Sequence, residues 1–205
     1  MSNIVNHPLL SVALKSVRPT QISVGMAEVT AKRESWRNMR KKDQKELLAT
    51  HWFPAILGPK GEAYIIDHHH LGLALLQEGV SHVWVLVQRN FSWLDIDVFW
   101  HAMEFYHWAY PYNEQGRRTD YSMIPAKLAG LRDDPYRSLA ARVRLAGGYA
   151  KDAAPYAEFL WADFYRPRIK LKGDEPFGGK VIRKALLLAH EHEAAYLPGW
   201  SGNIE

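Results

Sequence analysis

The sequence predicts an α+β fold, with a mixed α/β unit at residues 10–115 and a helical extension at residues 120–205. Three observations lead to this prediction. Strand-like and helix-like patterns alternate up to about residue 112. A turn rich in glycine and proline at residues 58–61 separates two apolar runs, which predicts a β-hairpin over residues 52–66. From residue 124 onward the apolar residues follow helical spacing only.

The composition is that of an ordinary globular protein. The chain has 205 residues, of which 47% are hydrophobic and 23% charged, enough to bury a core. It has no cysteine, which excludes a disulfide scaffold, a thiolate metal site and a thiol nucleophile. No segment approaches the ~20 apolar residues of a membrane span, and no signal peptide is recognisable, so we expect a soluble cytoplasmic protein. The net charge of +4 permits an anionic partner.

The first element of the N-terminal unit is a predicted strand at residues 12–17, which Pro19 ends. One long helix is expected over residues 26–50. It carries seven basic and four acidic residues, so it forms either a solvated face with i,i+4 ion pairs or a surface for phosphate groups.

The remaining elements follow from caps and apolar spacing. The hairpin leads into a short helix that ends at Gly79, and a buried strand follows at residues 83–87. Ser92 and Asp95 resemble a capping box, which predicts a helix from there to about Tyr106. Further predictions are a strand at 108–112, helices at 124–131, 136–146, 155–166 and 180–196, and loops at 147–148 and 172–179.

The sharpest local feature is the run of Asp67, His68, His69 and His70 at the predicted junction from strand to helix. Asp is a favoured N-cap residue, and the N–H groups and dipole at a helix N-terminus attract anions. Imidazoles there can bind phosphate oxygens or transfer protons. Three consecutive helical residues cannot all face one metal ion. The alternative interpretation is a capping Asp with histidines that are solvated or part of the core.

Other stretches of the chain are equally distinctive, at residues 14–21, 24–26, 32–33, 64–74, 116–118, 134–140, 147–151 and 157–164. Together they resemble the bacterial family of ParB-like nucleases, which has the ParB/sulfiredoxin-like fold. The resemblance covers most of residues 10–170. It implies that the N-terminal unit has this fold and that its turn from strand to helix binds nucleotide phosphates.

The turn motif can be compared residue by residue. ParB proteins carry Gly-Glu-Arg-Arg there, sulfiredoxins Gly-Cys-His-Arg and free-serine kinases Asp-Gly-His-His-Arg, each followed by two residues and an Ala. By this resemblance, Asp67, His69 and His70 match the kinase residues. His68 replaces the kinase Gly, which changes how the backbone approaches phosphate. Leu71 replaces the Arg, which removes a bidentate phosphate ligand.

The resemblance also limits which activity is expected. Thr20 lies in the kinase-like loop, but Gln21 stands where the kinases have a catalytic Glu, and Gln cannot act as a general base. Sulfiredoxin activity is excluded because the reactive thiol is missing. No basic recognition helix follows residue 124, which argues against DNA reading of the partition-protein type.

These observations favour a hydrolase of phosphate or phosphodiester bonds, a ParB-like nuclease or ATPase that depends on Mg²⁺ or Mn²⁺ and binds ATP or ADP. One alternative is a nucleotide- or nucleic-acid-binding module without turnover, and another is a phosphotransferase that resembles the free-amino-acid kinases. The oligomeric state stays open. The expected catalytic residues are Asp67, which is also the metal ligand, His69 and His70; the expected phosphate or nucleotide ligands are His68, Thr20, Gln21, Lys32 and Arg33.

Overall fold

The protein is described by a computed structural model that covers residues 8–172 and 177–203. Contacts divide it into two compact units, the first formed by residues 1–24 and 28–132 and the second by residues 25–27 and 133–205. The sequence placed this boundary between residues 115 and 120. The first unit continues to residue 132 because Ile124 belongs to its core cluster and the buried Leu128 lies against Gly72 of the same unit.

The first unit is built on a four-stranded mixed sheet in the order β1-β5-β3-β4. Strand β5 pairs antiparallel with β1 and parallel with β3, and β3 pairs antiparallel with β4. The hairpin expected over residues 52–66 is therefore present, and the mixed sheet with helices confirms the α+β class. The strands are β1 (Leu9–Ala13), β3 (Phe53–Leu57), β4 (Ala63–Ile65) and β5 (His82–Asn90).

The core of this unit lies between the sheet and its helices. Alternate residues of β5, Val83, Val85 and Val87, are buried, as expected for a strand with one face in the core. The turn between β3 and β4 needs glycine, because a Cβ at Gly58 would lie 2.5 Å from the Tyr64 ring. The cluster nearest this turn consists of Ile22, Ile56, Tyr64, Phe99, Trp100, Met103, Ala109 and Ile124.

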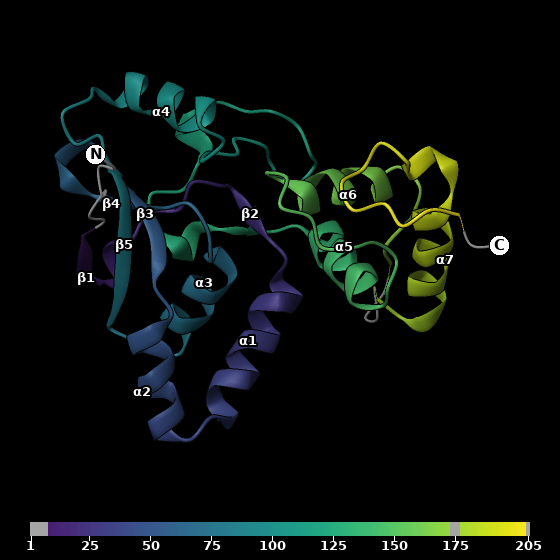
Figure 1. The fold of residues 1–205 in the computed structure, drawn as a ribbon, viewed down its shortest axis with the longest axis horizontal. Coiled ribbons are helices and arrows are strands. Elements are labelled where there is room, and N and C mark those ends of the chain that lie inside the picture. The colour runs from purple at the N-terminus through teal and green to yellow at the C-terminus, as the bar shows by residue number, and fades with distance from the viewer. Residues whose placement is uncertain (1–7, 173–176, 204–205) are drawn as a thin grey trace, which may run out of the picture. The chain divides into compact units, whose positions relative to one another are not determined.

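Four helices accompany the sheet. Figure 1 shows α1 and α2 beyond one end of strands β3 and β5, and α4 beyond the other end. The helices are α1 (Met26–Asn38), α2 (Lys41–Thr50), α3 (His69–Gln77) and α4 (Ile96–Phe105). Two further strands are short, β2 (Ser23–Val24) and β6 (Arg132–Asp133), and the Arg132 N–H donates to the carbonyl of Ile22.

The prediction of a single helix over residues 26–50 is wrong, because the structure has two helices there. The chain breaks at Arg40, which is extended (φ −65°, ψ 152°), and α2 starts at the next residue. The buried side chain of Gln44 stabilises this corner, because its amide donates to the carbonyl of Trp36 at 2.8 Å. Apolar spacing alone does not reveal such a corner, because the same periodicity continues in both helices.

Four other predicted boundaries also differ from the structure. The strand predicted at 12–17 ends at Ala13, and a 3₁₀ turn follows. The helix predicted from Ser92 begins only at Ile96, because Asp95 is extended (φ −66°, ψ 154°) and is the N-cap residue. Residues 108–112 form isolated bridges rather than a strand. Of the helix predicted at 124–131, only the 3₁₀ turn Leu128–Gly130 is formed.

The second unit is helical, as predicted. It contains α5 (Pro135–Leu145), α6 (Ala157–Tyr165) and α7 (Gly179–His190), which pack around an aromatic core where Tyr149 stacks on Trp161 with ring centroids 4.0 Å apart. The last helix is shorter than expected, because Glu191 is extended and a separate 3₁₀ turn follows it. Of the loop predicted at 172–179, residues 173–176 lie outside the described residues.

Candidate functional site

The turn between β4 and α3 carries the histidine run. Strand β4 ends at Ile65 and α3 starts at His69, so the strand-to-helix junction lies where the sequence predicted it. The first helical hydrogen bond runs from the Gly72 N–H to the His68 carbonyl. The N–H groups in the first turn of an α-helix point out of its N-terminal end, and in α3 this end lies at the β4–α3 turn.

The residue that caps α3 is His68 and not Asp67. His68 has a left-handed backbone conformation (φ 65°, ψ 22°), which favours glycine. Asp67 supports this conformation, because its Oδ1 accepts the His68 N–H at 2.6 Å. The predicted capping role of Asp67 is thus corrected to a contact with its own neighbour, and its carboxylate lies exposed at the surface.

His69 is buried, in contrast to the exposed Asp67. Its side chain is only 4% exposed, and its Nε2 accepts the N–H of Thr20 at 3.1 Å. The Thr20 hydroxyl donates to the carbonyl of Ile65 at 2.9 Å, and the Thr20 carbonyl accepts the Tyr110 N–H. His69 and Thr20 therefore tie the loop before α1 to the start of α3. This is the structural role that the alternative interpretation allowed for a histidine of the run.

The loop that contains Thr20 and Gln21 runs beside β4. The Arg18 N–H donates to the carbonyl of Ala63, and the Ile65 N–H donates to the carbonyl of Arg18. Gln21 is buried, and its amide donates to the carbonyl of Ser23 at 2.7 Å. Both Thr20 and Gln21 are thus part of the interior, and their role as phosphate ligands stays a prediction.

The structure adds a residue that the sequence analysis missed. The ring of His51, directly after α2, lies against the ring of His68 with centroids 4.4 Å apart. Phe53 meets the His68 ring edge-on at 5.8 Å. Ala55 pairs with Ile65 in the hairpin, and continuing this register brings residues 51–53 opposite residues 67–69. The predicted hairpin therefore contained the signal that could have identified His51.

The environment of His68 favours its neutral form. Burial of the half-exposed ring lowers its pKa from 6.5, and the charges of His51 and Lys32 act in the same direction, while the carboxylate of Asp67 opposes them. A neutral imidazole at the surface can accept a proton at neutral pH. Lys32 lies exposed on α1, near enough to influence His68 electrostatically.

The two predicted basic ligands of α1 have different surroundings. The Arg33 guanidinium donates to Glu78 at 2.7 Å, and Arg37 donates to the other oxygen of the same carboxylate at 2.8 Å. These bonds lower the pKa of Glu78. Glu78 follows the last residue of α3, about 13 Å from the first at 1.5 Å per residue. Arg33 is thus held at the far end of α3, whereas Lys32 lies near the turn.

The expected metal site has no complete set of protein ligands. Within residues 8–172 and 177–203, no group of three or more His, Asp or Glu side chains is arranged to hold a metal ion. Asp67 as a ligand of Mg²⁺ or Mn²⁺ stays a prediction. His70 is half-buried in the first turn of α3, and its catalytic role is likewise a prediction.

Comparison with known proteins agrees with the family resemblance noted in the sequence. A family model described as "Putative ParB-like nuclease" matches residues 10–167. The chain belongs to this family. The crystal structure of protein Atu1540 from Agrobacterium tumefaciens is 44% identical in sequence and covers 98% of this chain and 100% of its own, with a TM-score of 0.91. Comparison with curated proteins finds no match.

The backbone of this ParB-like protein is unusual at His68. His68 adopts the left-handed conformation that glycine adopts readily. Among the described parts of the chain, no helix combines the length and apolar character needed to cross a membrane.

Proposed function

We propose that this ParB-like protein binds nucleic acid at the β4–α3 turn and hydrolyses its phosphodiester bonds, with His68 and His51 as the proton-transfer pair. The observation that carries the proposal is the contact of these two imidazoles at the N-terminal end of α3. A helix N-terminus and the exposed ammonium of Lys32 both attract a phosphate group. Membership of a ParB-like nuclease family supports the same substrate class.

The proposed reaction needs one base and one acid. Neutral His68 takes a proton from a water molecule while the water oxygen forms a bond to phosphorus. The bond from phosphorus to the leaving oxygen breaks, and His51 in its protonated form gives a proton to that oxygen. The proton on His68 then returns to His51 through their contact or through solvent, which restores both residues.

The other predicted site residues have supporting parts in this proposal. Asp67 fixes the backbone of His68 through its N–H and favours the protonated ring after proton uptake. His69 and Thr20 hold the start of α3 in place. No step of this proposed reaction passes through a metal ion. The hydrolysis assay described next also tests the metal ion that the sequence predicted at Asp67.

The test is hydrolysis of labelled single-stranded DNA, duplex DNA and RNA, each in EDTA and with Mg²⁺ or Mn²⁺. We expect hydrolysis in EDTA and a loss of about 10²-fold or more in His51→Ala. The matched control is His101→Ala, which removes an exposed imidazole from α4. Full activity of His51→Ala would contradict the proposed pair. Activity only with added metal, abolished by Asp67→Asn, would instead support the metal site that the sequence predicted.

The second candidate function is nucleic-acid or nucleotide binding without hydrolysis. The burial of His69, Thr20 and Gln21 favours it, because three of the predicted site residues serve the interior. Thermal denaturation with ATP, ADP and oligonucleotides separates the candidates, because a ligand that binds the folded state stabilises it whether or not it is hydrolysed. The ATPase and amino-acid kinase hypotheses stay predictions, which the ATP and ADP arms of this measurement examine.

A further inference from the structure

A group of aromatic side chains lies at the surface where β5 leads into α4 and where α4 ends. We call it, together with the adjacent Arg89, the aromatic surface, and its rings are Phe91, Trp93, Tyr106 and Trp108. Trp93 is 71% exposed and Tyr106 is 39% exposed. The adjacent Phe105 is 76% exposed. A folded protein gains little by leaving such large rings in water, so the group indicates a binding function.

The rings of the aromatic surface are stacked on one another. Tyr106 and Trp108 lie 4.7 Å apart at an interplanar angle of 22°, and Tyr106 and Phe91 lie 6.2 Å apart at 29°. Trp93 meets Phe91 edge-on at 6.0 Å. The guanidinium of Arg89 lies over both Tyr106 and Trp108, at 5.1 Å and 6.0 Å from their ring centroids. Stacked rings with an overlying cation form a surface that suits another flat, electron-rich ring.

The turn that ends α4 holds this stack in place. The Trp108 N–H donates to the carbonyl of Met103 and the His107 N–H to that of Glu104, which is the Schellman arrangement of a helix C-terminus. The left-handed position of this motif is occupied by His107 (φ 56°) instead of the usual glycine. The turn reverses the chain so that Trp108 returns beside Tyr106. The aromatic surface is therefore built into the backbone.

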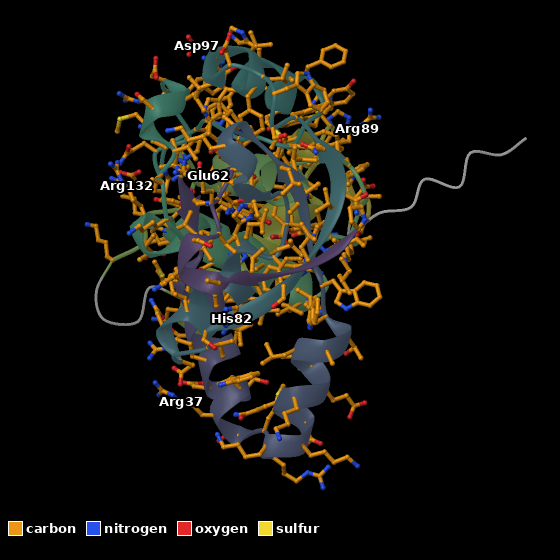
Figure 2. All side chains as sticks on the ribbon, turned by 90° about the vertical axis from the view of Figure 1, so that its left-hand side faces the viewer. Arg37, Glu62, His82, Arg89, Asp97 and Arg132 are labelled. Atoms are coloured by element: carbon orange, nitrogen blue, oxygen red, sulfur yellow. The ribbon has the colours of Figure 1, made fainter. Side chains whose placement is uncertain are left out.

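The charges around the aromatic surface favour an anion. Arg89 is exposed. Of the acids along this part of the chain, Glu104 is paired with Arg118 at 2.8 Å, and Asp95 lies at the N-terminus of α4, where the helix dipole offsets its charge. Figure 2 shows that Arg89 and Asp97 project from opposite sides of this end of the unit.

We propose that the aromatic surface binds single-stranded nucleic acid by base stacking, with Arg89 contacting both a base and the backbone charge. Aromatic rings interleaved with a cation bind single strands because every base offers a flat face, whereas duplex bases are already stacked. The proposal rests on the proposed function for its substrate class. It adds the strandedness of the substrate and a second binding site.

The aromatic surface is separate from the β4–α3 turn. The turn lies beside Phe53 at the start of β3, and Arg89 and Phe91 lie at the end of β5, which runs parallel to β3. The five residues of β3 span about 17 Å. A strand that occupies both sites must therefore cover several nucleotides, whereas a dinucleotide can occupy only one of them.

The experiment measures binding of a labelled oligothymidylate of about 20 nucleotides by fluorescence anisotropy, in EDTA and with His51→Ala as background to prevent hydrolysis. We expect Trp93→Ala to weaken binding by about 5- to 100-fold, which corresponds to the loss of one stacked base. Arg89→Ala weakens binding and reduces the slope of the logarithm of the binding constant against the logarithm of salt concentration by about 0.7. Arg89→Lys restores this slope, because the charge is kept, but does not restore the affinity. The matched control is Tyr196→Ala, another exposed ring (69%) in the second unit, which leaves binding unchanged.

Three outcomes of the measurements of binding and oligomeric state would overturn this proposal. The first is equal binding by wild type and Trp93→Ala, with both proteins folded by circular dichroism. The second is binding of the matching duplex as tightly as the single strand. The third is a dimer of the wild type that Trp93→Ala dissociates in light scattering, which would make the aromatic surface a contact between two copies.

The proposed function can fail independently of the aromatic surface. If Trp93→Ala binds weakly and no variant or wild type hydrolyses nucleic acid, the aromatic surface stands and the hydrolase proposal fails. If dinucleotide and long-strand hydrolysis are both unchanged in Trp93→Ala, the hydrolase proposal stands and the aromatic surface fails. The combined expectation is a higher KM for long strands with unchanged cleavage of a dinucleotide.

Discussion

Two turns of the first unit place a histidine in the left-handed backbone conformation, and they do so for different purposes. At the start of α3, His68 itself faces the surface, with its ring against His51. At the end of α4, His107 leaves its neighbours Tyr106 and Trp108 stacked on one another. At the start of α3 the side chain of His68 is itself the functional group that we propose. At the end of α4 the backbone turn at His107 positions the side chains of Tyr106 and Trp108.

This difference teaches that backbone strain alone does not identify a functional group. A left-handed residue other than glycine costs about 1 kcal/mol or more, and such residues persist where the surrounding structure holds them. Only the contacts around each turn reveal whether the side chain or the chain reversal is used. Replacing each histidine by glycine keeps the backbone and removes the ring, which separates the two cases.

The largest effect is expected from His68→Gly. Glycine adopts the left-handed conformation without strain, so we expect the protein to remain folded with unchanged or higher thermal stability. Hydrolysis should fall by about 10²-fold or more, because the proposed base is lost. The measurements are oligonucleotide hydrolysis and thermal denaturation of the same preparation. Retained activity would show that the His68 ring is not the base.

His69 provides the contrast within the same run. His69→Ala leaves the buried N–H of Thr20 without an acceptor and opens a cavity, so we expect a loss of about 2–4 kcal/mol in the free energy of unfolding. His69→Gln carries an acceptor of similar reach and should lose less than half as much. Urea denaturation followed by circular dichroism measures both. Equal stability of wild type and His69→Ala would contradict the structural role of His69.

Much of the fold could be predicted from the sequence, because local patterns determine it. The hairpin, the helix after the histidine run, strand β5 and the three helices of the second unit follow from apolar spacing and from Gly58 and Gly79. The break at Arg40 could not be predicted, because it depends on the Gln44 side chain reaching the carbonyl of Trp36. Residues 108–112 are rich in aromatic residues, as strands often are, yet they serve a helix-terminal turn and isolated bridges.

The strand-to-helix junction that carries the candidate site could be located in the sequence, but the surroundings of its residues could not. The junction at residues 67–70 is a local feature, whereas burial is a tertiary one. Adjacent histidines of the run differ because His69 turns inward to Thr20 and His68 turns outward to His51. The pairing of β3 with β4 brings His51 to the turn, which the predicted hairpin could have indicated, whereas only the ion pairs with Glu78 show that Arg33 is held elsewhere.

An intermediate effect is expected from pH. The pKa of His68 is lowered from 6.5, so the folded state takes up the proton only at lower pH than the unfolded state. Between these two values the unfolded state binds more protons, and the stability that His68 contributes therefore falls as pH decreases below 6.5. As the pH falls below 6.5, the stability of His68→Gly should decrease less than that of the wild type, because the titrating ring is absent. When kcat/KM of the wild type is measured against pH, its fall on the acidic side should have an apparent pKa below 6.5. An apparent pKa above 6.5 would contradict His68 as the base.

The smallest effect is expected at His107, where glycine and valine form a matched pair. His107→Gly removes the ring from an exposed position but keeps the left-handed turn, so stability should change by at most about 1 kcal/mol, and oligothymidylate binding should stay within twofold. His107→Val has a β-branched side chain that strongly disfavours this conformation, so the turn should open and Tyr106 should separate from Trp108. Binding should then weaken severalfold while cleavage of a dinucleotide at the distant β4–α3 turn is retained. If His107→Gly weakens binding as much as His107→Val, the histidine ring itself contacts the ligand, and the contrast between the two turns disappears.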